Sequence, residues 1–352
     1  MTKRLSYIFA IVVATAMMAC QHDNITHIVS PEQDAVPEGM VEIEFVANTP
    51  LMTEVVVRGV DPDGIDVQNL TLFCFNDFGL YITHVAAELD PAVETPSLSG
   101  TYKAIIPEDT RIIHFVGNQN PNLFDADMFI NRSEDEIQDD MVGASGMIIY
   151  WSRFIFQTGA GSHQQQLASA NGGEGIKLIR NQAMVSINNP DNEWIDITGF
   201  VSTNVYAFGT TAPYHPEKRF PTAGTAFEWP GEDFVTIPQN RTKLSDITEV
   251  YTKSEEYIFE HENTLQDPVS IILRGRPAGS SEELYYRVMI IDEQGEQMMI
   301  RRNHHYKLNI QGKLTYGSRN FEEALNSPAT NNVWVAVDDW VNEVSYGDIT
   351  LS

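Results

Sequence analysis

Beyond its first 19 residues, the chain keeps its apolar residues in short runs that are separated by turn-forming residues. Residues 41–47 show this best, because valine, isoleucine and phenylalanine alternate there with Glu42 and Glu44. A period of two with one charged face is typical of a half-buried β-strand. The chain also contains 23 glycines and 17 prolines, which favour turns over long helices. These features predict an all-β protein.

A second run, residues 67–75, is apolar on both faces, with Leu72 and Cys74 on one and Phe73 and Phe75 on the other. It predicts a central strand covered on both sides, which pairs as a hairpin with residues 80–87. Residues 125–140 are mixed and acidic, and we expect a solvated helix there. Residues 322–325 predict one further short helix. The remaining strands are expected at residues 53–57, 101–106, 111–116, 147–157, 176–188, 195–208, 269–273, 285–291, 298–311 and 333–337.

A length of 352 residues suggests about two domains. Residues 158–175 are rich in glycine, serine and glutamine and show no core pattern, so we place the domain boundary at their end. The prediction is therefore two tandem β-sandwich domains, residues 41–175 and 176–352, with few short helices.

The N-terminus resembles a secretory signal. Lys3 and Arg4 precede the apolar residues 5–19, which are fewer than the roughly 20 that span a membrane. Ala19 before Cys20 resembles a lipobox, so we expect a signal peptide at residues 1–19 and a lipidated Cys20. Residues 20–40 are polar and predict a flexible tether. The alternative is ordinary signal cleavage, with Cys20 an incidental thiol.

Charge and motifs exclude several classes of function. The chain has 22 basic and 49 acidic residues, a net charge of −27, which argues against binding nucleic acid. Its two cysteines predict no disulfide framework. We find no nucleophile elbow, zinc-protease motif or phosphate-binding loop, and therefore expect no catalytic, cofactor or metal residues. The acidic turn at residues 61–66 lacks the spacing of an EF-hand.

Two other reactive residue types have plain structural interpretations. His304 and His305 are adjacent in a predicted strand, so their rings point to opposite faces, and we favour a surface pair. Cys74 lies within an apolar strand and is expected to be a buried structural thiol, because reactivity requires an accessible, positive setting.

Several short motifs occur in an order found in one family. They are the hairpin at residues 67–81, the segments 111–118 and 178–183, the segment 286–306 with its Arg-Asn-His-His-Tyr ending, and residues 322–332. In this order they resemble segments of the type V pilus fimbrillins of Bacteroidales. The resemblance covers most of the chain after the signal peptide.

The resemblance implies transthyretin-like sandwich domains and a palmitoylated outer-membrane lipoprotein precursor that matures into a cell-surface fimbrium supporting adhesion. It also implies cleavage by an arginine-specific protease, release of the first strand, and its replacement by a donor strand from another fimbrial subunit. Arg58 fits this role because it follows the strand at residues 41–47 and is followed by Gly59 and a Pro-Gly turn, which favour exposure. The alternative is a lone surface arginine.

Other interpretations stay open at this point. Residues 333–351 predict either a last strand with a donor segment or only closing strands, so stalk, tip and anchor positions are all compatible with the sequence. A surface glycan-binding lipoprotein would share the anchor and the fold, and it would need exposed aromatic residues. An enzyme built on a β-sandwich ranks lowest.

Overall fold

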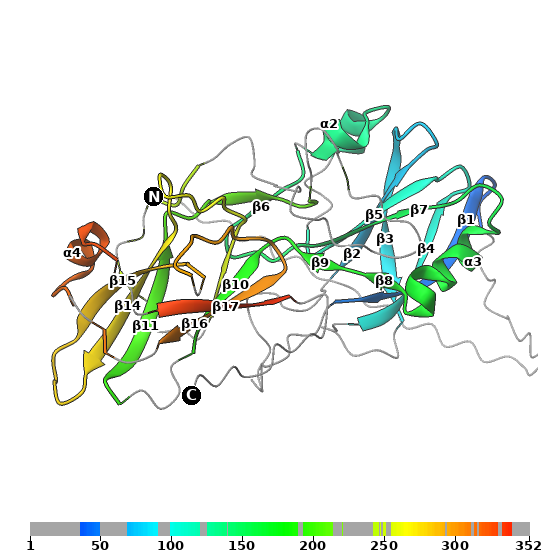
Figure 1. Cartoon of the computed structure of the whole chain (residues 1–352). Coiled ribbons are helices and arrows are strands. Elements are labelled where there is room, and N and C mark those ends of the chain that lie inside the picture. Colours follow the sequence, from blue (N-terminus) through cyan, green and yellow to red (C-terminus); the bar gives the residue numbers. More distant parts are fainter. Residues whose placement is uncertain are drawn as a thin grey trace, which may run out of the picture. The chain divides into compact units, whose positions relative to one another are not determined.

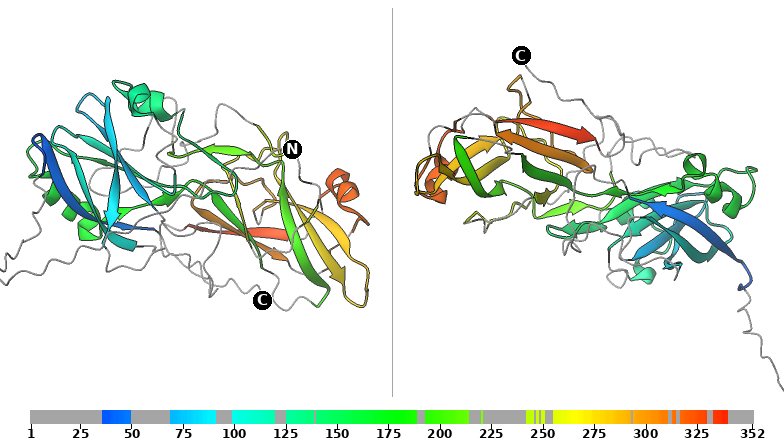
Figure 2. Two further views of the ribbon diagram at one scale, coloured as in Figure 1. Left: turned by 180° about the vertical axis from the view of Figure 1, so that it is seen from behind. Right: turned by 90° about the horizontal axis from the view of Figure 1, so that it is seen from below.

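The computed structural model describes residues 36–49, 69–90, 99–119, 125–138, 140–188, 193–213, 220, 242–245, 247, 249–250, 255–292, 294–310, 313–314, 317–329 and 333–339 (Figures 1 and 2). In these residues strands predominate and the helices are short, which confirms the predicted all-β class. The domain boundary at residue 175 stays a prediction.

An eight-stranded sheet has the order β8-β1-β4-β3-β2-β5-β7-β9. Neighbouring strands are antiparallel, except that β1 and β8 are parallel. The strands are β1 (Met40–Asn48), β2 (Leu70–Phe75), β3 (Tyr81–Leu89), β4 (Ser99–Pro107), β5 (Ile112–Gly117), β7 (Tyr150–Ile155), β8 (Ile176–Lys177) and β9 (Ile179–Arg180).

Strand β2 is buried on both faces, as predicted. Leu72 and Cys74 belong to one core cluster, whereas Phe73 and Phe75 belong to another on the opposite face. The predicted hairpin with β3 is also confirmed by their antiparallel pairing. The Cys74 side chain is fully buried, as predicted, and burial raises the pKa of its thiol to about 12.

Two further sheets share one core cluster. The four-stranded sheet has the order β13-β10-β16-β17, and the three-stranded sheet has the order β11-β14-β15. Their strands are β10 (Ala183–Asn188), β11 (Ile195–Thr203), β13 (Glu255–Ile258), β14 (Ser270–Pro277), β15 (Leu284–Met289), β16 (His304–Ile310) and β17 (Val333–Asp339). Two sheets packed over a shared core form a sandwich. A separate ribbon pairs β6 (Val142–Ala144) with β12 (Phe208–Thr210).

Helix α4 (Phe321–Asn326) confirms the helix predicted at residues 322–325. Its N-cap, Asn320, accepts a hydrogen bond from the backbone N–H of Glu323 at 2.9 Å. Strand β17 pairs with β16 along all of its residues, so this part of the C-terminal region belongs to a sheet. The residues after Asp339 lie outside the described part of the chain.

The prediction that residues 158–175 lack a core pattern is wrong. They contain helix α3 (His163–Ala168) and a 3-10 helix, η2 (Ala170–Gly173). Ser162 and Gln165 form a capping box, which satisfies two backbone N–H groups at the start of α3. Leu167 and Ala170 are buried in the first core cluster. Each of the two short helices places one apolar residue in this cluster, so the polar composition of the segment concealed them.

The acidic segment 125–140 is helical but not simply solvated, which corrects the prediction. It forms α1 (Ala126–Phe129) and α2 (Glu134–Gln138). Glu134 is largely buried and its carboxylate accepts hydrogen bonds from His114 at 2.7 Å and Arg153 at 2.6 Å. The indole N–H of Trp151 donates to His114 Nδ1 at 3.2 Å, so the proton of a neutral His114 lies on Nε2.

Burial alone would raise the pKa of Glu134, but hydrogen bonds and charge from His114 and Arg153 lower it to about 2. Burial lowers the pKa of His114, because desolvation disfavours the charged ring.

The prediction that His304 and His305 form a surface pair is wrong for His305. His305 is only 7% exposed, and its Nε2 lies 2.6 Å from the hydroxyl of Ser186 on the neighbouring strand β10. His304 is half-buried and its Nδ1 bonds to the carbonyl of Arg302 at 2.8 Å.

Candidate functional site: strand β1 and its groove

Strand β1 shows the alternation that its sequence predicts. Ile43, Phe45 and Ala47 are buried, whereas Glu42 and Glu44 are exposed. The pleat of a β-strand sends successive side chains to opposite faces, so one face of β1 fills the first core cluster. This confirms the half-buried strand predicted at residues 41–47.

The inner edge of β1 pairs with β4 over its whole length, from Met40 opposite Pro107 to Asn48 opposite Ser99. Neighbouring strands such as these are joined by a ladder of backbone hydrogen bonds. The salt bridge between Glu44 and Lys103, at 3.3 Å, joins two exposed side chains and adds little to stability.

The core-facing side chains of β1 make specific contacts. The Phe45 ring stacks on Tyr102 with ring centroids 5.9 Å apart, and it meets Phe115 edge-on at 5.1 Å. Ile43 lies opposite Ala104, whose small side chain leaves room for it. Without β1, the sheet would therefore present an unpaired edge of β4 above an aromatic pocket.

The outer edge of β1 has much less backbone pairing. Strand β8 pairs in parallel with only two of its residues, and the N–H of Leu178 donates to the carbonyl of Asn48 at 2.7 Å. Midway along β1, helix α3 lies beside the strand and takes the place of a further strand (Figures 1 and 2). The Glu44 N–H donates to Gln164 Oε1 at 2.6 Å, and Gln164 Nε2 donates to the Glu44 carbonyl at 2.9 Å.

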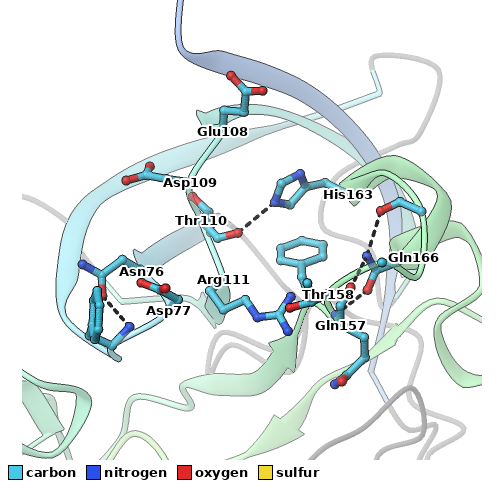
Figure 3. A pocket seen from close by; sticks show the side chains of 14 residues that line it. Asn76, Asp77, Glu108, Asp109, Thr110, Arg111, Gln157, Thr158, His163 and Gln166 are labelled. Carbon is cyan, nitrogen blue, oxygen red and sulfur yellow. Dashed lines mark hydrogen bonds between the residues drawn. The ribbon is translucent and has the colours of Figure 1, made fainter.

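Side-chain hydrogen bonds from two residues of helix α3 attach it to neighbouring segments. His163 Nε2 donates to the carbonyl of Thr110 at 2.8 Å. The side-chain amide of Gln166 accepts from the Gln157 N–H at 2.7 Å and donates to the Gln157 carbonyl at 3.2 Å (Figure 3). These contacts hold α3 against the turn after β4 and the end of β7, so Gln164 faces β1 from a fixed support.

A polar cavity of about 560 Å³ adjoins this anchor, near the residue at which β1 begins. Glu108 and Asp109 line it from the turn after β4, Arg111 lines it from just before β5, and Gln157 lines it from the segment after β7 (Figure 3). The N–H of Glu108 donates to the Gly39 carbonyl at 2.9 Å, which joins the cavity wall to the entry of β1. In the part of the chain that the structure describes, no three His, Cys, Asp or Glu side chains gather as a metal site would require.

Two motifs that carried the family resemblance meet in one buried network. From the segment 178–183, the Arg180 N–H donates to the side-chain oxygen of Asn303 at 3.0 Å. From the segment 286–306, the Arg302 guanidinium forms an ion pair with Glu260 at 2.7 Å and donates to the Thr211 carbonyl at 2.7 Å. The network joins the end of β9 to the start of β16, and we interpret it as structural.

Neither this network nor the amide contact of Gln164 with β1 was predicted from the sequence. Charged and amide residues inside otherwise apolar segments were the available signal for the network, because a charge is buried only when it is paired. No sequence signal marks Gln164, since glutamines occupy three consecutive positions of α3 and only the fold shows which one faces β1.

The three predicted site residues, Cys20, Arg58 and Gly59, lie outside the described residues. β1 precedes every other described strand in sequence. The next described residue after Thr49 is Asn69. A single cut between these two residues would leave β1 attached to the rest of the protein only by non-covalent contacts. Among the described residues, no helix is both long enough and apolar enough to cross a membrane.

No protein-family model matches the chain. The chain is 24% identical over 344 residues to the major fimbrium tip subunit FimE of Porphyromonas gingivalis. This match covers 95% of the chain and 57% of FimE, so the chain spans little more than half the length of the curated relative. The sequence similarity confirms the resemblance to fimbrial subunits of Bacteroidales that the motifs predicted.

Solved structures with some similarity include a C-terminally truncated form of the tip fimbrial protein Mfa3 of Porphyromonas gingivalis, with a TM-score of 0.49 and 12% identity over 86% of this chain and 100% of that truncated chain. A fimbrial assembly protein from Parabacteroides distasonis has a TM-score of 0.43 and 11% identity over 77% of this chain and 90% of its own.

Proposed function

We propose that this chain is a structural subunit of a type V fimbria that assembles on the cell surface by strand exchange and supports cell adhesion. Its similarity to a fimbrial tip subunit supports the fimbrial assignment. The observation that carries the strand-exchange mechanism is β1, a strand that comes first in the described chain, fills the core with alternate side chains, and has only partial backbone pairing on its outer edge.

Export and maturation involve two sites near the N-terminus, first Cys20 and then Arg58. The precursor is lipidated on Cys20 and carried to the outer membrane. An arginine-specific protease then cuts between Arg58 and Gly59, which separates β1 covalently from the sheet that holds it. Cleavage here is supported by the position of Arg58 between β1 and the next described strand, β2.

The physical chemistry of β1 explains why a donor strand would replace it. Burying a side chain the size of isoleucine or phenylalanine stabilises a fold by about 1.5–3 kcal/mol each, so an empty groove at Ile43 and Phe45 would cost several kcal/mol. A strand from another subunit restores this burial and also satisfies the backbone edge of β4. Exchange therefore needs no cofactor and no catalytic residue.

The similarity to a tip subunit favours the tip among the three positions that the sequence left open. A subunit at the tip accepts a donor strand and donates none. Under this proposal the purified, matured chain remains monomeric when it is alone and binds one neighbouring subunit when that subunit is supplied.

The test is a pair of substitutions at the cleavage site, expressed in cells that carry the fimbrial system and its protease. Arg58→Ala is expected to give an uncut precursor that is absent from fimbriae, as judged by its mass and by immunolabelling. Arg58→Lys is the matched control: an arginine-specific protease leaves it uncut, whereas added trypsin restores cleavage and assembly. Normal maturation and assembly of Arg58→Ala would contradict the assignment of Arg58.

A further inference from the structure

The outer edge of β1 has a regular geometry. The carbonyl of Glu44 faces Gln164, and the carbonyl of Asn48 faces Leu178 in β8. Gly175 approaches the carbonyl of Val46 so closely that a Cβ on Gly175 would lie 2.4 Å from it. Alternate residues of a strand direct both backbone groups to the same neighbour. The even-numbered residues of β1 therefore direct their backbone N–H and C=O groups to the outer edge, and the odd-numbered residues direct theirs to β4.

Gln164 makes the two contacts that a paired strand would make with Glu44. Its side-chain oxygen accepts the N–H and its side-chain nitrogen donates to the carbonyl, at 2.6 and 2.9 Å. Both contacts are made to the main chain, so they do not depend on which side chain stands at position 44. They do depend on register, because a one-residue slip would turn the backbone groups of that position toward β4.

At the core face of the groove, by contrast, the side chain at each position determines whether a strand fits. Position 43 is opposite Ala104 and accommodates a branched aliphatic residue. Position 45 lies between Tyr102 and Phe115 and accommodates an aromatic ring. Position 47 lies opposite Gly100, where an added Cβ would meet Leu89 at 2.5 Å, so the space there is closely filled.

We propose that Gln164 is a latch that sets the register of whichever strand occupies this groove, and that the groove selects an extended segment of a neighbouring subunit with a large apolar, any, aromatic, any, small pattern at positions 43 to 47. This inference rests on the proposed function, because the neighbouring strand enters only if β1 leaves. Gln164 acts as a positioning residue and takes no part in chemistry.

The test uses the full chain without its lipid, with a site-specific protease sequence replacing residues 53–58, so that β1 can be freed without any assumption about Arg58. After cleavage, a fluorescent peptide of residues 40–48 is added, and fluorescence anisotropy follows its exchange for β1. Two lost hydrogen bonds predict that Gln164→Ala exchanges about five- to thirtyfold faster.

The matched control is Gln165→Ala, which removes the capping-box hydrogen bond from the Ser162 N–H to the Gln165 side chain and leaves Gln164 in place. It is expected to change the exchange rate by less than about threefold. Equal acceleration by the two substitutions would overturn the proposal, since Gln164 would then act only through the stability of the helix.

Peptides with a single N-methyl group test the register. Methylation at Glu44 removes the N–H that Gln164 accepts, so it is expected to weaken binding about fivefold in the unsubstituted chain and little in Gln164→Ala. Methylation at Phe45 removes a bond to β4 and is expected to weaken binding equally in both proteins. An equal loss in both proteins on methylation at Glu44 would overturn the latch.

Amide hydrogen exchange of the intact, uncut chain gives an independent measurement that needs no peptide. The Glu44 N–H is expected to exchange at least about fivefold faster in Gln164→Ala than in the unsubstituted chain, whereas the Phe45 N–H changes less. Unchanged protection at Glu44 would overturn the proposal. None of these measurements uses Arg58 or another subunit, so their failure is distinguishable from failure of the proposed function.

Discussion

Replacing Phe45 with alanine should show how much the core-facing side chains of β1 contribute to the stability of the fold. Phe45 is 3% exposed and contacts Tyr102 and Phe115. Truncating a buried phenylalanine removes its burial free energy and leaves a cavity, which together cost about 3–5 kcal/mol. Because Phe45 lies on a strand with only partial outer pairing, we expect partial collapse of the cavity and a loss of about 3 kcal/mol.

The matched control is Val46→Ala on the same strand. Val46 is 38% exposed on the outward face, so its truncation should change the free energy of unfolding by no more than about 0.5 kcal/mol. Urea unfolding of the uncut chain measures both variants. In the cleaved protein, a loss of 3 kcal/mol corresponds to a roughly 150-fold lower affinity for β1, which is measured by the rate at which β1 dissociates. Similar losses for the two variants would refute the role of the aromatic pocket.

Two further predictions concern buried groups away from β1. Glu134→Gln leaves the Arg153 guanidinium buried without its counter-charge and should lower stability by about 3 kcal/mol at neutral pH. Since the folded pKa of Glu134 is about 2 against an ordinary value of 4.5, this difference should be complete above pH 4.5 and shrink as the pH falls toward 2; a pH-independent difference in urea midpoints would argue against it. In a form of the chain that lacks Cys20, Cys74 should resist alkylation at pH 8 until urea unfolds the protein, and rapid labelling of the folded chain would contradict its burial.

Strands were the most predictable part of the fold, because local alternation and burial agree there. Strand β1 has one charged and one apolar face, and β2 is apolar on both, so each sequence is compatible with only one environment. Helix α3 was missed because Leu167 is its only residue in the apolar core cluster, and its other buried residue is the polar Gln166. Its capping box, Ser162 with Gln165, was the readable signal.

The functional contacts were less predictable because they join residues far apart in sequence. Glu44 and Gln164 are 120 positions apart, and their contact is made through the main chain of one and the amide of the other. Glu134 looked like part of a solvated acidic segment, since neither His114 nor Arg153 is close to it in sequence. Pairing of this kind depends on topology, which periodicity does not specify.

The measurement that tests the account most directly is the intact mass of this subunit after isolation from assembled fimbriae. If strand exchange occurs at this groove, the isolated chain begins at Gly59 and lacks β1, and a strand of a neighbouring subunit fills the groove. A fimbrial subunit that still contained residues 40–48, either covalently or as a bound peptide, would contradict strand exchange at this groove.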